Sequence, residues 1–277
     1  MKTVMIIPNT LKKQSVDFTK KVIDYLTKKG FMTKVILSDK DEIVEDAEFA
    51  LVLGGDGTIL RSAKKLYKYD TLIFGINFGH MGYLTEVDSK DAFAGIDKLI
   101  SSDYHVEERI MIEGEVTREG KEIYNFIALN DVNISRSTLL HAIRMNLFIN
   151  SKPIESIFGD SVIVSTPTGS TSYNFSAGGP VLTPTSDNIV ITPVCPQFSP
   201  HTSIVADGTD TISVSISYDK RFDDGDACIE IDGGERFVTE NEDIVTIRKS
   251  KYKTRIAKIT DKSFYQVLRE KISSNNN

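Results

Sequence analysis

A continuous apolar run followed at once by a glycine-rich turn is the feature of this sequence that most limits the possible folds. Residues 49–53 read FALVL and residues 54–58 read GGDGT. An unbroken apolar run of this length is typical of a strand buried on both faces, as in a parallel sheet covered by helices. Apolar residues then recur at helical spacing from Ile59 to Tyr67. The pattern therefore predicts a strand, a glycine turn and a helix in succession.

The same alternation of strand and helix patterns extends over the first part of the chain. Further strands are predicted at 4–8, 31–37 and 71–77. Between the first two, Ser15 is expected to cap a helix and Gly30 to end it in a left-handed conformation. We therefore predict an α/β N-terminal domain over residues 1–105, with a Rossmann-like parallel sheet that carries the GGDGT loop.

After Tyr104 the pattern changes to short, alternating or β-branched runs separated by turn pairs such as Asn150-Ser151. This predicts an all-β, sandwich-like C-terminal domain over residues 106–250. Residues 251–277 place Phe264, Val267 and Leu268 at helical spacing. We expect this last segment to pack back on the N-terminal domain and its tail to be disordered.

Composition excludes some classes of function. The net charge is -6, with 33 basic and 39 acidic residues, which argues against a nucleic-acid or anionic-membrane partner. No apolar stretch approaches the roughly 18 residues that span a bilayer. Both cysteines, Cys195 and Cys228, are expected to be buried in a reducing compartment, and a cytoplasmic location follows. The four histidines lack partners at metal-ligand spacing, so no metal held by protein ligands alone is predicted.

The acid inside the glycine loop, Asp56, needs an explanation. A glycine turn that opens a helix exposes N–H groups to an anion, and a carboxylate would repel a phosphate there. The loop matches neither the Walker nor the dinucleotide-binding pattern. Two interpretations remain open: a tight turn with Thr58 as the helix N-cap, or an acid that accepts the proton of an alcohol during phosphoryl transfer.

The sequence then resembles a known family. GGDGT is similar to the loop of a superfamily that includes NAD kinases, diacylglycerol and sphingoid kinases and, in a related form, phosphofructokinases. STPTGSTSY at 165–173, with GGP at 178–180, resembles the NAD kinase signature. Further segments resemble that family in order: GINFGHMGYLTEV at 75–87, EERIMIEGEV at 107–116, ALNDV at 128–132 and IDGGERF at 231–237. The resemblance covers nearly the whole chain.

The resemblance implies transfer of the γ-phosphoryl of ATP, or of a polyphosphate, to the 2′-hydroxyl of the adenosine ribose of NAD, giving NADP. It implies Mg²⁺ or another divalent cation with the donor, and a homo-oligomer, dimer or tetramer. Asp56 matches the catalytic general base, and Gly54, Gly55 and Thr58 match the donor loop. The residues that match substrate-binding positions are Gly57, Asn130, Asp131, His141, Asp160, Thr171, Ser172, Tyr173, Asn174, Phe175 and Ser176.

Three positions depart from the family pattern. Asp131 is one methylene shorter than the usual glutamate, Phe158 stands where many members have an arginine, and Gly234 replaces a frequent glutamine, leaving Asp232 as the candidate there. The alternatives to an NAD kinase are a lipid or sphingoid kinase and a nucleotide-sensing protein without chemistry. The sequence leaves open the choice of donor, the choice between NAD and NADH, and regulation by product.

Overall fold

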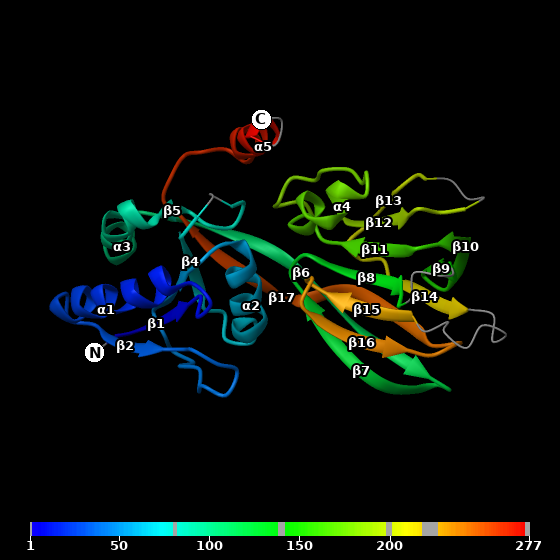
Figure 1. Cartoon of the computed structure of the whole chain (residues 1–277), viewed down its shortest axis with the longest axis horizontal. Coiled ribbons are helices and arrows are strands. Elements are labelled where there is room, and N and C mark those ends of the chain that lie inside the picture. Colours follow the sequence, from blue (N-terminus) through cyan, green and yellow to red (C-terminus); the bar gives the residue numbers. More distant parts are fainter. Residues whose placement is uncertain (1, 80–81, 138–141, 198–200, 218–226, 275–277) are drawn as a thin grey trace. The chain divides into compact units, whose positions relative to one another are not determined.

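The computed structural model of the chain describes residues 2–79, 82–137, 142–197, 201–217 and 227–274. The chain forms two compact units (Figure 1). The first comprises Met1–Arg109 and Tyr252–Asn277, and the second comprises Ile110–Lys251. Two long strands, β6 (His105–Arg118) and β17 (Ile244–Lys258), each contribute residues to both units.

The first unit is built on a parallel sheet. Its strands run in the order β2-β1-β3-β4-β17, and β5 also pairs with β4. Their bounds are β1 (Thr3–Pro8), β2 (Met32–Val35), β3 (Phe49–Leu53), β4 (Leu72–Asn77) and β5 (Val87–Asp88). Each of these pairings is parallel, including that of β17 with β4 at Arg255 and Ile256. The prediction of a parallel α/β fold is confirmed.

Helices cover both faces of this sheet. They are α1 (Lys13–Lys28), α2 (Asp56–Leu66) and α3 (Ala92–Ile100), with a 3-10 turn η1 (Ser89–Asp91) before α3. On one face, α1 and α3 share a core with Phe74, and the rings of Phe18 and Phe93 lie 5.4 Å apart. The next residue of β4, Gly75, points to the opposite face, where a Cβ would lie 2.5 Å from the Ile59 side chain of α2. Gly75 therefore lets α2 approach the sheet closely.

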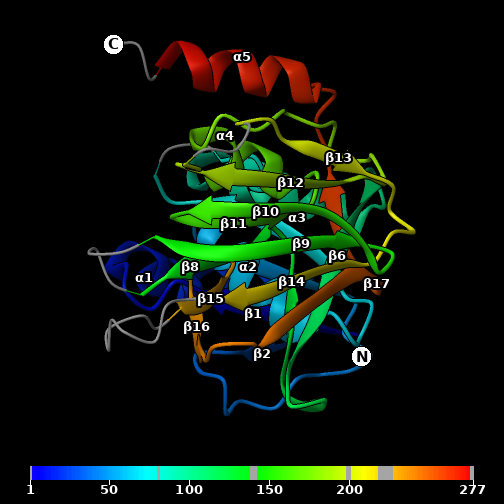
Figure 2. The same ribbon diagram turned by 90° about the vertical axis from the view of Figure 1, so that its right-hand side faces the viewer.

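The second unit is a sandwich of two sheets. The first sheet contains β6, β7 (Lys121–Ala128), β9 (Ile143–Ile149), β10 (Lys152–Gly159), β14 (Ile212–Ser217) and β17. Figure 2 shows β9, β14 and β17 side by side in it. The second sheet has the order β13-β12-β11-β8-β15-β16. Its strands are β8 (Asp131–Arg136), β11 (Ser161–Ser165), β12 (Ile189–Val194), β13 (Ile204–Ala206), β15 (Ala227–Ile231) and β16 (Glu235–Thr239).

One apolar core joins the two sheets of the second unit. It includes Val132 and Val164 from the second sheet and Val214 and Val245 from the first. Val132 pairs with Val164 and Val214 with Val245, so each pair points to one side of its own sheet. The sandwich-like architecture predicted from the alternating runs is confirmed.

Three local predictions are confirmed and two are wrong. Gly30 has φ +85° just after α1, and Asn150 and Ser151 form the left-handed turn between β9 and β10. Cys228 is buried, but Cys195 is exposed. Ser15 does not cap α1, since Lys12 occupies that position. Instead the buried Ser15 hydroxyl donates to the Leu53 carbonyl and accepts the Asn9 N–H, which joins α1 to the ends of β3 and β1.

The remaining helices are short or terminal. They are η2 (Gly169–Thr171) and α4 (Tyr173–Ser176) in the second unit and α5 (Phe264–Ser274) in the first. Within the described part of the chain, no helix is both long and apolar enough to cross a bilayer.

Gly30→Ala should lower the free energy of unfolding by about 1 kcal/mol. Nothing lies within 4 Å of a Cβ at Gly30, so the cost is purely that of a left-handed backbone conformation. Urea unfolding of the two proteins measures it. Gly30→Asn should cost less, because asparagine tolerates this conformation better; equal losses for both variants would contradict the explanation.

Candidate active site

The glycine loop joins β3 to α2 with no room for a side chain at its first position. A Cβ on Gly54 would lie 2.3 Å from the Thr58 hydroxyl oxygen. Gly55 occupies the N-cap position and α2 begins at Asp56. Thr58 is therefore not the cap; it is buried, and its hydroxyl accepts a hydrogen bond from the Asn9 amide. Gly54 thus serves close packing, and the Asp56 side chain lies at the positive end of the helix dipole.

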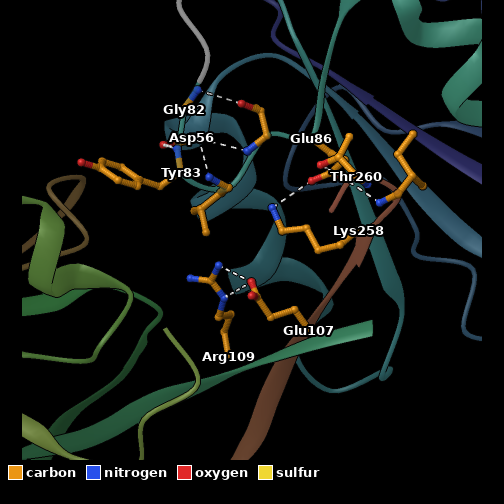
Figure 3. Close-up of polar contacts among 11 residues, drawn as sticks. Asp56, Gly82, Tyr83, Glu86, Glu107, Arg109, Lys258 and Thr260 are labelled. Atoms are coloured by element: carbon orange, nitrogen blue, oxygen red, sulfur yellow. Dashed lines mark hydrogen bonds and ion pairs between the residues drawn. The ribbon is translucent and has the colours of Figure 1, made fainter. Parts of the chain in front are cut away.

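The Asp56 carboxylate is held by three consecutive backbone N–H groups (Figure 3). Oδ2 accepts from Tyr83 at 2.7 Å, and Oδ1 accepts from Leu84 at 3.0 Å and from Thr85 at 3.3 Å. These donors fix the direction of the carboxylate at the start of α2. A carboxylate offers about four lone-pair positions, so both positions of Oδ1 are used and one position of Oδ2 is left. Oδ2 is the atom of Asp56 that can accept a proton.

A buried cation lies in the same neighbourhood. Arg109 is only 3% exposed, and its Nε donates to Glu107 at 2.7 Å. Burial lowers the pKa of Arg109, while the charges of Glu107 and then Asp56 act in the opposite direction. The pKa of Tyr83 is raised, by burial first and by the Asp56 charge second. Sequence reasoning did not single out Arg109 or Tyr83, although both lie in segments that resemble the family.

A cavity of about 240 Å³ opens beside the glycine loop at the carboxyl ends of β1 and β2. Its lining residues combine an apolar wall with hydroxyls and cations: Ile7, Pro8, Thr10, Ile36, Leu37, Ser38, Asp39, Thr58, Arg61, Ser62 and Lys65. The Lys65 ammonium lies 2.8 Å from Asp39 and lowers the pKa of that exposed carboxyl. The carboxyl edge of a parallel sheet is the usual ligand site of α/β folds. This cavity can accept a base and an anionic group together.

In the second unit, the turn Leu129–Asp131 is held from two sides. Asp232 accepts hydrogen bonds from the N–H groups of all three residues, at 3.0, 2.7 and 3.2 Å. On the other side, Thr166 donates its backbone N–H to the Asn130 carbonyl and its hydroxyl to the Leu129 carbonyl. The Asn130 amide oxygen is buried and has no hydrogen-bond partner. A buried acceptor without a partner calls for an explanation, and a polar ligand at this turn would supply one.

The hydroxyl-rich stretch divides into a structural and an accessible part. Residues 161–170 are buried, and the hydroxyls of Ser165, Thr166 and Ser170 bond to backbone groups of the chain itself. A Cβ on Gly169 would lie 2.2 Å from the Asn130 carbonyl oxygen, so glycine lets this stretch pass against the turn. Up to Ser170, these hydroxyls therefore bond to the chain itself.

The residues that follow reach solvent. Tyr173 is 43% exposed and Phe175 44%, and Ser172 and Ser176 are also exposed. Asn174 differs, because it is fully buried and its amide bonds to the carbonyls of Ser170 and Pro180 and to the Thr192 hydroxyl. Asn174 thus holds the loop while its neighbours are free to meet a ligand.

Three positions from the sequence analysis remain: Asp160, Phe158 and His141. Asp160 pairs with Arg136 at 3.0 Å. At the Phe158 position, where an arginine was expected, the guanidinium of Arg144 on the paired strand lies 5.5 Å from the ring centroid, so a cation is present nearby. His141 lies outside the described residues. Among the residues that are described, no group of three or more His, Cys, Asp or Glu side chains could hold a metal ion.

The chain resembles known proteins over nearly its whole length. Residues 34–104 match the model of the ATP-NAD kinase N-terminal domain, and residues 129–259 match that of the ATP-NAD kinase C-terminal domain. An NAD kinase of Thermoanaerobacter sp. (strain X514) is 35% identical over 285 residues, covering 99% of both chains. An NAD kinase of Clostridium botulinum (strain Kyoto / Type A2) is 37% identical over 280 residues, covering 99% of this chain and 97% of the other.

Two solved structures show the same fold. Yeast NADH kinase complexed with NADH has a TM-score of 0.88 at 18% identity, covering 100% of this chain and 89% of that one. An NAD kinase from Archaeoglobus fulgidus in complex with ATP has a TM-score of 0.79 at 24% identity, covering 99% of both chains.

The two matched domains and the curated relatives define a phosphotransferase. The chain belongs to the NAD kinase family. A lipid or sphingoid kinase is therefore not favoured.

Asp131 should make the stability of the protein depend on pH. Burial, and then the charge of Asp232, raise the pKa of Asp131 from 3.8 to about 7. The unfolded chain then loses this proton at lower pH than the folded one, so the stabilising contribution of the protonated group is lost between about pH 4 and pH 7. Asp131→Asn should therefore gain stability relative to the unchanged protein across that window, by up to about 4 kcal/mol.

Urea unfolding at several pH values tests this expectation. The exposed Asp207 of the same unit offers a control, because hydrogen bonds from Thr209 lower its pKa and Asp207→Asn should show the opposite trend. A stability difference for Asp131→Asn that does not vary between pH 4 and pH 7 would contradict the assigned pKa.

Gly82→Ala should displace the Asp56 carboxylate. A Cβ on Gly82 would lie 1.9 Å from Oδ1 of Asp56, so the carboxylate must move from its three donors. We expect turnover to fall by about 10²-fold, the cost of a misplacement near 1 Å. Gly79→Ala is the matched control, because its Cβ would meet only the flexible end of Lys12, at 3.3 Å. Steady-state kinetics on both variants measures the effect. Equal losses of turnover for Gly82→Ala and Gly79→Ala would contradict the geometric explanation.

Proposed function

We propose that this chain transfers the γ-phosphoryl of ATP to the 2′-hydroxyl of the adenosine ribose of NAD, with Asp56 as general base. In the step, the O–H bond of the ribose breaks and Oδ2 of Asp56 receives the proton. The ribose oxygen forms a bond to the γ-phosphorus, and the bond from that phosphorus to the bridging oxygen breaks, releasing ADP. A loose transition state of this kind needs mainly positioning and charge stabilisation.

The observation that carries the proposal is the fixed carboxylate at the start of α2. Three backbone donors orient Asp56 and leave one acceptor position on Oδ2. General-base help of this kind is worth roughly 10²- to 10⁴-fold in rate. A nucleotide-sensing protein without chemistry would not need an acceptor position left open on this carboxylate.

The donor is proposed to occupy the cavity beside the glycine loop, with Gly54, Gly55 and Thr58 at its phosphate end. Arg61 and Lys65 supply positive charge there, and Ile7, Pro8, Ile36 and Leu37 supply an apolar wall. The wall suits the base of ATP, whereas a polyphosphate would need only the cations, so ATP is the favoured donor. A neighbour of the same fold is described in complex with ATP.

The acceptor is proposed to contact the second unit. Gly57 of the loop, the turn residues Asn130 and Asp131, Asp160, and the accessible Thr171, Ser172, Tyr173, Phe175 and Ser176 are the proposed substrate residues, with His141 kept from the sequence analysis. Asn174 acts by holding the loop. The exposed Tyr173 and Phe175 rings can stack on a base or a nicotinamide.

A divalent cation, Mg²⁺ in particular, is proposed to arrive with the donor phosphates. Mg²⁺ prefers a few carboxylates together with substrate phosphates and water, and the described residues hold no cluster that would bind it without the donor. Bound there, it would neutralise charge on the transferred group. A homo-oligomer and a cytoplasmic location complete the proposal; light scattering of the purified protein tests the first.

Asp56→Asn should keep the fold and NAD binding but lose turnover by at least about 10²-fold. The amide oxygen can still accept from Leu84 and Thr85, but the NH₂ group in place of Oδ2 can neither accept from Tyr83 nor take a proton at neutral pH. The assay is incubation with NAD, Mg²⁺ and ATP, with NADP formation as the readout and polyphosphate, NADH and diacylglycerol as alternative reactants. Undiminished turnover of the variant would remove the assigned base, and product from diacylglycerol alone would restore the lipid-kinase alternative.

A further inference from the structure

The segment Gly82–Glu86, which holds Asp56, is itself fixed at its other end. Within it, the Gly82 N–H donates to the Thr85 hydroxyl at 2.9 Å. The Glu86 N–H donates to the Gly75 carbonyl of β4 at 2.9 Å. These bonds set the path of the backbone, but all three of its donors to Asp56, those of Tyr83, Leu84 and Thr85, come before the point where the segment joins the sheet.

The Glu86 side chain connects this segment to the end of β17 (Figure 3). It is buried, and its Oε1 accepts from the backbone N–H groups of Ile259 and Thr260, both at 2.9 Å, and from the Thr260 hydroxyl at 2.8 Å. Its Oε2 lies 3.0 Å from the Lys258 ammonium. A buried carboxylate is tolerated only with such a full set of partners. Glu86 thus fixes residues that lie more than 170 positions away in the chain.

The C-terminal segment meets the loop a second time. The Tyr83 ring lies 6.3 Å from that of Phe264 at the start of α5, and the Lys271 ammonium lies 5.9 Å from the Tyr83 centroid. Tyr83 is also the residue whose N–H makes the shortest of the three bonds to Asp56. Tyr83 at one end of this stretch and Glu86 at the other therefore both contact residues that follow Lys258 in the chain.

We propose that Glu86 is a positioning residue for phosphoryl transfer: by tying the 82–86 segment to residues 258–260, it keeps the backbone donors where they orient Asp56. This inference rests on the proposed role of Asp56 as general base. Glu86 itself does not touch the reacting atoms. Its effect should appear in kcat, because a misaligned base raises the barrier of the chemical step, and much less in KM for NAD.

Glu86→Gln is the informative variant, since removing the side chain altogether would leave Lys258 buried without a partner. The amide oxygen can still meet Ile259 and Thr260, but the amide N–H₂ would face the Lys258 ammonium, donor against donor. We expect kcat to fall about tenfold or more, with KM for NAD changed by less than about threefold. In the free protein, hydrogen exchange at the Tyr83 and Leu84 amides should become faster.

Two matched changes separate positioning from simple loss of stability. Glu86→Gln combined with Lys258→Met removes the facing donor and should restore part of kcat. Thr260→Ser keeps the hydroxyl bond to Glu86 and should keep kcat, whereas Thr260→Val loses it and should lower kcat. As a control, Asp243→Asn in the second unit weakens another buried carboxylate that is paired with an arginine, Arg118; it should cost stability and leave kcat unchanged.

The exchange measurement needs no activity, so it tests the inference independently of the proposed function. If Asp56→Asn retained turnover, the base assignment would fail, while faster exchange at Tyr83 in Glu86→Gln would still establish the mechanical connection. Unchanged exchange at both amides, or a fall in kcat for Asp243→Asn equal to that for Glu86→Gln, would overturn the positioning role.

Discussion

Three successive backbone N–H groups that converge on one carboxylate are the interaction on which the candidate site depends. Consecutive N–H groups form a concavity that binds anions, and here the anion is the Asp56 side chain. The arrangement gives hydrogen-bond partners to three backbone N–H groups, and it fixes the direction of the carboxylate without using another side chain. It also answers the question raised by an acid in a glycine loop: the acid faces the 83–85 segment, and its charge is stabilised by that segment.

The second unit also has one carboxylate that accepts three consecutive backbone N–H groups, but the roles of carboxylate and backbone are reversed. Asp232 accepts the N–H groups of residues 129–131, but there the carboxylate is the support and the turn is the proposed ligand site. One consequence is electrostatic. Fixing Asp232 near the buried Asp131 adds a like charge to the cost of burial, which is why the pKa of Asp131 rises to about 7. The substitution of aspartate for the family's usual glutamate thus falls on a group that titrates near neutrality.

Two cations of the first unit lie near the Asp56 arrangement. Arg109 is buried beside Glu107 and attracted by Asp56, and Lys258 is paired with Glu86 behind the loop. Buried ion pairs of this kind add little net stability but specify one geometry, because breaking either partner leaves an uncompensated charge. A fixed geometry is what a phosphoryl-transfer site requires of its scaffold.

The sequence by itself determined the parallel α/β unit, the β-sandwich, the turn at Asn150-Ser151 and the special conformation of Gly30, because these follow from local periodicity and from residues with unusual backbone freedom. It also indicated the family through contiguous motifs. Strands such as β8, β10, β13 and β16 have no clear run in the sequence, since their residues alternate weakly and depend on neighbouring strands for pairing.

Only the tertiary structure decided what each motif residue does. It showed that Ser15 joins two strand ends and that Asn174 and the hydroxyls up to Ser170 form hydrogen bonds within the chain. It also showed that Glu86 and Asp232 accept hydrogen bonds from backbone N–H groups far away in the sequence. These roles rest on hydrogen bonds between residues far apart in the chain, and no local pattern encodes such partners. A polar side chain reads the same in the sequence whether its bonds go to a ligand or to the protein's own backbone, because only folding determines which of the two it meets.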